Sequence, residues 1–236
     1  MSNEAKKTEN KEILVKYNIG DVEVKLTPSI VQEYILGSGS GKITLPEFKF
    51  FCEMARSRGL NPFTKEIFLI KYGNSPATIV VSKQAILKRA TMHPQFNGLV
   101  SGIFVKTTDG KLEKRDGGIL LNDETLVGSW AEVYRKDWDK PMYCSCSMSE
   151  IKQDKNPSWQ KMPVTMAIKT ATVRACRDAF PEDLGGLYES DEIEKPNHST
   201  GFSEADLKSE EPEFIEVDTE TGEVIEDKNK INLSDL

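Results

Sequence analysis

The stretch that decides the fold is IFLIKYGNSPATIVV, which covers residues 67–81. Its two outer runs, 67–72 and 77–81, are rich in β-branched and aromatic residues, and the Gly-Asn-Ser-Pro run between them favours a turn. A helix is expected directly afterwards, over 83–92. Further strands with partial alternation are expected at 99–106, 126–135 and 142–148. This order predicts an α+β protein in which an antiparallel β-sheet packs with helices, because βα units do not alternate along the chain.

The segments before and after this sheet also have recognisable patterns. Residues 13–26 alternate apolar and polar residues around a Gly-Asp turn, which predicts a hairpin. A short helix is expected from Pro28 up to the Gly/Ser run at 37–41. Thr44 and Glu47 form a Thr-x-x-Glu capping box at the start of a helix that Gly59 ends, and Leu45, Phe48, Cys52 and Ala55 share one face of it. The last long helix is expected over 163–180.

Charge divides the chain into a basic body and an acidic tail. Residues 191–236 hold 15 acidic and 4 basic residues, a net charge of −11, whereas the rest of the chain has a net charge of +4. We therefore expect an N-terminal arm with a possible hairpin at 1–27, a folded core at 28–195, and an acidic, mostly disordered tail at 196–236. A basic body is suited to binding a polyanion.

The sequence also limits where the protein works. The longest apolar runs fall short of the roughly 18 residues that a membrane helix needs, so no membrane partner is expected. The polar N-terminus lacks the apolar core of a secretion signal, which favours a cytoplasmic location. In that compartment Cys52, Cys144, Cys146 and Cys176 are expected to be free thiols.

Several patterns suggest catalytic or ligand chemistry but lack the residues that it requires. The run GSGSGK at 37–42 has Leu36 and Ile43 where a phosphate-binding P-loop needs Gly and Ser/Thr, so a hinge is the better interpretation. Cys144 and Cys146 share a strand face, but zinc needs two more ligands. Acidic residues of the body are scattered, and His93 fits a turn. We therefore expect no catalytic residue, no metal site and no cofactor.

Basic residues in and before the last helix are more informative. Lys169, Arg174 and Arg177 interrupt its apolar pattern, and Arg174 and Arg177 are neighbours on its surface. Lys152, Lys155 and Lys161 precede it, with Trp159 among them. Such a set is either an ordinary solvated face or a groove for single-stranded nucleic acid, where cations track the backbone and aromatic rings stack on bases.

Five motifs in register give the chain a resemblance to a known family. They are GLNPFTKEI at 59–67, HPQFNG at 93–98, YRKD at 134–137, Trp159-Gln160 with Pro163, and RDAFP at 177–181 followed by Gly-Leu-Tyr at 186–188. In this order they resemble the phage lambda Bet (Red-beta) family of single-strand annealing recombinases, of the Bet/RecT type. The resemblance covers about residues 30–195.

This resemblance implies a non-enzymatic function in phage recombination. Proteins of this family bind single-stranded DNA, anneal complementary strands without ATP through an annealed duplex intermediate, and assemble as homo-oligomeric rings or helical filaments. It also implies a core similar to that of the eukaryotic mitotic annealing protein, and action in the cytoplasm of a bacterial host. The implied protein partners are a phage 5′–3′ exonuclease and the host single-strand-binding protein, although only a short acidic segment follows the core here.

The resemblance also assigns DNA-binding positions. Lys65, Lys88, Arg135, Lys136 and Arg177 stand where the family has basic residues near its groove, and Lys169 lies close to such a position. Val164 and Thr165 replace two basic residues, for which Lys161 compensates. With Arg174 from the helix pattern, the predicted DNA-binding set is Lys65, Lys88, Arg135, Lys136, Lys161, Lys169, Arg174 and Arg177.

Two other functions are compatible with parts of this pattern. A passive single-stranded DNA-binding protein would protect strands without annealing them. A metal-dependent nuclease would need clustered carboxylates, which the sequence does not show, so this class is disfavoured.

Overall fold

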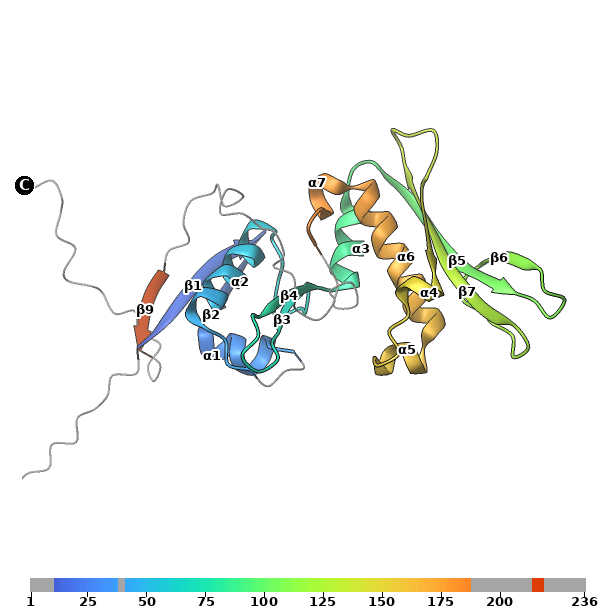
Figure 1. The fold of residues 1–236 in the computed structure, drawn as a ribbon. Coiled ribbons are helices and arrows are strands. Elements are labelled where there is room, and N and C mark those ends of the chain that lie inside the picture. Colours follow the sequence, from blue (N-terminus) through green and yellow to red (C-terminus); the bar gives the residue numbers. More distant parts are fainter. Residues whose placement is uncertain (1–10, 38–40, 188–213, 219–236) are drawn as a thin grey trace, which may run out of the picture. The chain divides into compact units, whose positions relative to one another are not determined.

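The computed structural model describes residues 11–37, 41–187 and 214–218. Within it the chain forms two compact units, one from residues 1–79 with 196–236 and one from residues 80–195 (Figure 1). We call them unit 1 and unit 2. Both units use parts of the predicted 28–195 core. The expected α+β class with antiparallel sheets is confirmed.

Unit 1 is built on a small antiparallel sheet with the strand order β2-β1-β9. Strands β1 (Lys11–Ile19) and β2 (Val22–Leu26) form the predicted hairpin around Gly20, which has a φ of +57°. Strand β9 (Phe214–Asp218) pairs with the other edge of β1, so that Lys11 lies opposite Asp218. The predicted disorder of the tail stays a prediction, because the rest of 196–236 lies outside the described residues.

Helix α2 (Leu45–Ser57) covers the core of unit 1. The capping box is confirmed, since Thr44 Oγ1 accepts from the N–H of Glu47 and the Glu47 carboxylate accepts from the N–H of Thr44. Phe48, Cys52 and Ala55 are buried as predicted, but Leu45 is exposed, and Phe51 completes the buried face. The expected short helix is a turn of α-helix, α1 (Pro28–Ile30), continued by a π-helix, η1 (Val31–Ile35).

Strands β3 (Ile67–Ile70) and β4 (Thr78–Val81) form the predicted antiparallel pair around Gly73. The boundary between the two units falls within β4. Helix α3 (Lys83–Met92) follows, as the sequence predicts, and Ser82 caps it.

Unit 2 is a four-stranded antiparallel sheet with a long helix on one face. Its strand order is β6-β5-β7-β8, from β5 (Phe96–Lys106), β6 (Leu112–Asp116), β7 (Thr125–Arg135) and β8 (Met142–Ser147). Helix α6 (Pro163–Ala179) packs on β7, β8 and β5, and Ser129 Oγ of β7 donates a 2.6 Å hydrogen bond to the carbonyl of Ala167. Short helices α4 (Met148–Ile151), α5 (Pro157–Lys161) and α7 (Pro181–Leu184) adjoin it.

The two faces of this sheet differ in what they carry. Ser129, Ala131 and Val133 of β7 are buried on the α6 side. Because successive side chains of a strand alternate, Trp130, Glu132 and Tyr134 lie on the opposite face. None of the described helices is long and apolar enough to span a bilayer.

Candidate nucleic-acid interface

Three motifs that are far apart in the sequence meet where α6 ends. Phe180 follows the last residue of α6 and is buried, with its ring centroid 4.6 Å from that of His93 and 6.3 Å from that of Phe96. The N–H of Gln95 donates to His93 Nδ1, so His93 has the structural role in a turn that its sequence context predicts. This packing fixes the ends of α3, β5 and α6 against one another.

Arg135, the last residue of β7, joins this same end of unit 2. Its Nη1 donates to the carbonyl of Ala179 at 2.6 Å, and its Nε and Nη2 donate to the Asp137 carboxylate at 2.9 and 2.7 Å. The guanidinium carbon lies 4.5 Å from the ring centre of Trp138 and 5.1 Å from that of Phe180. Hydrogen bonds to Asp137 raise the pKa of Arg135, and the pKa of Asp137 is lowered in return. Arg135 therefore holds β7 to α6, and the Asp137 carboxylate balances its charge.

Lys136 and Arg177 are two further basic residues at this end of unit 2. Lys136 is exposed, and its Nζ donates to the carbonyl of Pro94 at 2.8 Å. Arg177 is half-buried in the last turn of α6, and its Nη1 donates to the carbonyl of Leu187 at 3.0 Å. Backbone carbonyls thus orient both side chains, and Arg135, Lys136 and Arg177 form what we call the α6-end cluster.

The remaining predicted residues lie elsewhere. Lys88 is exposed on α3, and Lys161 is exposed as the last residue of α5. Lys169 is half-buried in α6, eight positions before Arg177 and so about 12 Å away along the helix axis. Arg174 lies near β8, with its Nη1 3.6 Å from Cys146 Sγ. Lys65 is exposed in unit 1, in a turn where it has a φ of +57°.

The structure buries Trp159, the tryptophan that lies among the basic residues in the sequence, and exposes Trp138. Trp159 of α5 is 1% exposed, so it cannot stack on a base. Trp138, which is not among the DNA-binding residues predicted from the sequence, is 39% exposed and lies against Arg135. Its position directly after the Tyr-Arg-Lys-Asp motif is the signal that could have identified it.

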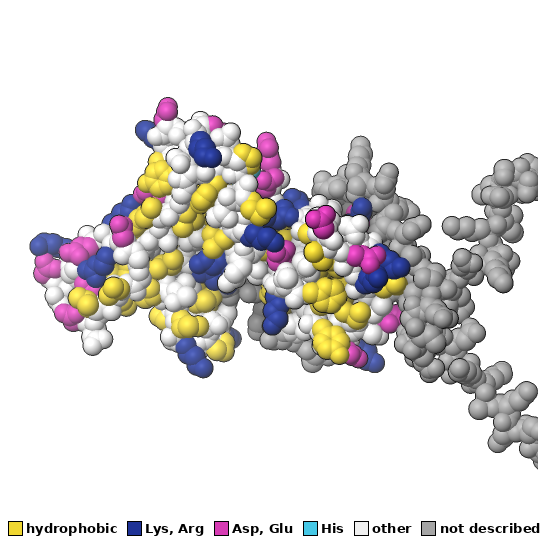
Figure 2. Space-filling view, turned by 180° about the vertical axis from the view of Figure 1, so that it is seen from behind, with side chains coloured by type: hydrophobic (Ala, Val, Ile, Leu, Met, Phe, Trp, Pro, Cys, Tyr) yellow, Lys and Arg dark blue, Asp and Glu magenta, His cyan; other side chains and the backbone are white. Residues whose placement is uncertain are grey.

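The surface of unit 2 shows how charge is distributed around these elements. On the face in Figure 2, Lys and Arg side chains lie interspersed with hydrophobic ones, and both signs of charge meet at the outer tip of the sheet. The pairs there include Lys111 with Asp109 at 2.8 Å, and Arg115 with Glu124 at 2.7 Å. Paired charges at the tip are less available to phosphates than the exposed lysine of the α6-end cluster.

The motifs that meet at the α6 end carry the family resemblance, and a family model tests it over most of the chain. The model described as the RecT family matches residues 29–206. The chain belongs to the RecT family. It is therefore a Bet/RecT-type single-strand annealing protein, a class that acts in DNA recombination. A search of curated proteins finds no match.

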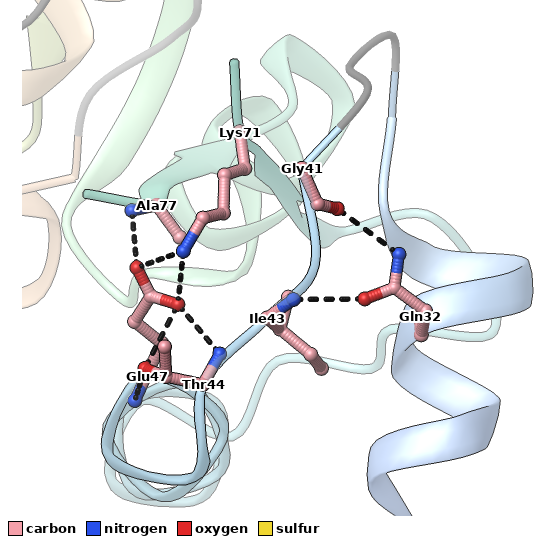
Figure 3. Close-up of polar contacts among 7 residues, drawn as sticks. All are labelled: Gln32, Gly41, Ile43, Thr44, Glu47, Lys71 and Ala77. Carbon is pink, nitrogen blue, oxygen red and sulfur yellow. Dashed lines mark hydrogen bonds and ion pairs between the residues drawn. The ribbon is translucent and has the colours of Figure 1, made fainter. Parts of the chain in front are cut away.

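In this RecT-family chain, the GSGSGK run adjoins a closed polar network instead of a phosphate site. Gln32 Nε2 donates to the carbonyl of Gly41 at 3.1 Å, and its Oε1 accepts from the N–H of Ile43 at 2.8 Å (Figure 3). The next helix begins with the capping box, so its first N–H groups already have the Thr44 and Glu47 oxygens as acceptors. A carboxylate already occupies the place where a helix N-terminus would bind an anion.

The Glu47 carboxylate also anchors a buried lysine. Lys71, which is 5% exposed, donates to both carboxylate oxygens at 2.8 and 2.7 Å, and the N–H of Ala77 donates at 2.8 Å (Figure 3). Burial acts to raise the pKa of Glu47, but the hydrogen bonds from Lys71, Thr44 and Ala77 outweigh it and lower the pKa to about 2. This network ties α2 to the β3–β4 turn.

The open face of the unit 2 sheet carries a polar network as well. Lys114 Nζ lies 3.7 Å from the ring centre of Trp130 and donates to Glu132 at 2.8 Å, and the Tyr134 hydroxyl donates to the same carboxylate at 2.7 Å. These hydrogen bonds lower the pKa of Glu132 and raise that of Lys114. The Lys114 ammonium lies over the ring of Trp130, which is 2% exposed.

Acidic and thiol groups do not gather into a metal centre in the described part of the chain. No group of three or more His, Cys, Asp or Glu side chains there could hold an ion. Cys144 and Cys146 have their sulfurs 4.0 Å apart with Arg174 beside them, and this cation disfavours a second positive charge.

Proposed function

We propose that this RecT-family chain anneals complementary single strands of DNA without ATP, as a homo-oligomer that binds the strands through its basic residues. The observation that carries the proposal is the α6-end cluster. Three motifs of the resemblance meet there and bring Arg135, Lys136 and Arg177 to one end of unit 2. Neighbouring copies in an oligomer would extend this surface along a strand.

The chemistry of the cluster suits annealing. Lysine and arginine contacts to phosphates bind every sequence equally and leave base edges free to pair. Neutralised phosphates on two strands also repel each other less. Because backbone carbonyls orient the cations before DNA arrives, less side-chain entropy is lost on binding. Trp138, exposed beside Arg135, would stack on a base.

The wider DNA-binding set is part of the same proposal. It comprises the α6-end cluster with Lys65, Lys88, Lys161, Lys169 and Arg174. We also propose that the acidic tail recruits a phage 5′–3′ exonuclease and the host single-strand-binding protein, that the core is similar to that of the mitotic annealing protein, and that the protein acts in the host cytoplasm.

A strand-annealing assay tests the function. Purified protein is mixed with two complementary oligonucleotides in EDTA without nucleotide, and duplex formation is followed beside electron micrographs of the complexes. We expect annealing at full rate and ring-shaped or filamentous assemblies. Strands that are bound but not paired would show a passive binding protein instead. Cleavage that appears with magnesium and disappears with EDTA would show a nuclease.

A further inference from the structure

Two thiols lie side by side on strand β8, outside the α6-end cluster. Cys144 and Cys146 occupy alternate positions, so both side chains lie on the α6 side of the sheet, while Tyr143, Ser145 and Ser147 between and beside them are exposed. The two sulfurs are 4.0 Å apart. Cys146 is 3% exposed, and Cys144 is half-buried and therefore closer to solvent.

Arg174 makes this pair chemically unequal. Its Nη1 lies 3.6 Å from Cys146 Sγ, which places a permanent positive charge beside that sulfur. The hydrogen bond from Cys144, together with Arg174, lowers the pKa of Cys146 against the effect of its burial, although Glu150 opposes them. The pKa of Cys144 is raised by its hydrogen bond with Cys146, by burial, and by the nearby Cys146 and Asp178. Cys146 is thus the sulfur of the pair whose thiolate form Arg174 favours.

We propose that Cys144 and Cys146 are a reversible dithiol–disulfide site that reacts with hydroperoxides. The Cys146 thiolate attacks the outer peroxide oxygen and the O–O bond breaks, which leaves a sulfenic acid on Cys146. The hydroxide or alkoxide that departs takes a proton from solvent and becomes water or an alcohol. The Cys144 sulfur then attacks that sulfur and loses its proton, and the sulfenic oxygen leaves as water. One peroxide is consumed for each disulfide formed.

The geometry of the strand makes the disulfide a labile one. Alternate residues of a strand have Cα atoms about 6.4 to 6.8 Å apart, which is the upper end of the span that a disulfide accepts. Strained disulfides of this kind are easily reduced. Strand β8 is an edge strand that pairs only with β7 in its sheet, so its backbone can adjust when the bond closes.

The other two cysteines provide an internal comparison. Cys52 and Cys176 are completely buried in α2 and α6. Burial raises the pKa of Cys52 above its usual range and that of Cys176 to about 12, so neither is a thiolate at neutral pH.

Peroxide treatment of the full-length protein tests the proposal. The protein is exposed to hydrogen peroxide, its free thiols are blocked with N-ethylmaleimide in denaturant, and peptides are assigned by mass spectrometry. We expect an intrachain Cys144–Cys146 disulfide that dithiothreitol reduces. Cys52 and Cys176 should stay reduced and therefore be alkylated by N-ethylmaleimide. Both Cys144 and Cys146 remaining free, or a disulfide between two chains, would overturn the proposal.

Variants separate the two steps. In Cys144→Ser the reaction should stop at a Cys146 sulfenic acid that dimedone traps. Arg174→Gln should slow peroxide consumption by about threefold to tenfold, because fewer Cys146 side chains are thiolates, and Arg174→Lys should restore most of the rate. If Arg174 is purely structural, the parent protein, Arg174→Gln and Arg174→Lys should consume peroxide at equal rates. That result would contradict the assignment of Cys146 as the nucleophile.

Discussion

The Glu47 carboxylate accepts hydrogen bonds from Thr44, Lys71 and Ala77, so its titration should change the stability of the protein. A carboxyl whose pKa is lowered by folding stabilises the protein fully above its ordinary pKa of 4.5, and that contribution is lost as the pH falls toward about 2. We expect unfolding by urea to require progressively less denaturant over this interval. In Glu47→Gln that part of the pH dependence should disappear.

The same variant should be destabilised at neutral pH. Glu47→Gln leaves the buried Lys71 ammonium without its counter-charge, which should cost about 3 kcal/mol. Glu23→Gln is the matched control, because Glu23 pairs with Lys25 where both side chains are about half exposed. Loss of that surface pair should cost less than about 0.5 kcal/mol. Equal losses in the two variants would mean that Lys71 does not depend on Glu47.

Lys136 allows a clean test of the α6-end cluster. Lys136→Ala should weaken binding to all single-stranded sequences about equally, and it should flatten the dependence of log K on log salt by roughly 0.7. Thermal stability should change little, because the side chain is exposed and the substitution removes a hydrogen bond from its Nζ to the carbonyl of Pro94. The measurement is fluorescence anisotropy of a labelled oligonucleotide at several salt concentrations.

Lys111→Ala is the control for this variant. Lys111 is also an exposed lysine of unit 2, but it follows the far end of β5 and pairs with Asp109. The strand has 11 residues, so it separates the two lysines by about 33 Å. An unchanged salt slope in Lys136→Ala, or the same change in Lys111→Ala, would remove Lys136 from the DNA site.

Gly102 is where strand β5 accommodates the tryptophan of strand β7. A Cβ at this position would lie 2.0 Å from the carbonyl oxygen of Arg115 and 2.8 Å from Trp130 Nε1, which itself donates to that carbonyl. Gly102→Ala should therefore force β6 and the indole apart and cost about 2 kcal/mol in unfolding free energy. Ser145→Ala, exposed directly opposite Trp130, should stay within about 0.5 kcal/mol. A Gly102→Ala protein as stable as the parent would show that β6 shifts without cost.

Some elements could be predicted from the sequence because their own residues determine them. Helix α2 has a complete capping box, and α6 has length and a continuous apolar face. Strand β6, with the sequence Leu-Glu-Lys-Arg-Asp, was missed because it is charged and mostly exposed. It forms a strand because it pairs with β5, and the residues of β6 alone do not indicate that pairing.

The candidate site was predictable only in part, for the same reason. The resemblance placed Arg135, Lys136 and Arg177 in one set, but it did not show that Arg135 bonds to a carbonyl 44 residues away. The pattern around Trp159 left open a groove in which it would stack on a base, but Trp159 is buried within α5. Tertiary contacts decide whether an amphipathic side chain is buried or exposed.

At the scale of the whole molecule, two truncations distinguish the effect of the tail's negative charge from the effect of strand β9. Deleting residues 219–236 removes a net charge of −3 and keeps β9, whereas deleting 197–236 removes −9 and takes β9 away from β1. Both should tighten DNA binding at low salt, the longer deletion more so, because an acidic segment repels phosphates. Binding weakened by the shorter deletion would show that the tail belongs to the working core.

Only the longer deletion should change how the protein behaves in solution. Without β9 the N-terminal half of β1 becomes an open strand edge, which pairs readily with other chains. We expect the 197–236 deletion to form larger species in light scattering, and the 219–236 deletion to match the full-length protein. Identical profiles for the two truncated proteins would mean that β9 does not protect β1.

The unequal exposure of the tryptophans gives the molecule an optical reporter of its own. Trp130 and Trp159 are sheltered from solvent, whereas Trp138 faces it beside the Arg135 guanidinium. A dissolved quencher such as acrylamide therefore reaches chiefly one of the three indoles, the one in the candidate interface. A strand that stacks on Trp138 would shield it, so the arrival of DNA can be timed by emission from the unlabelled protein.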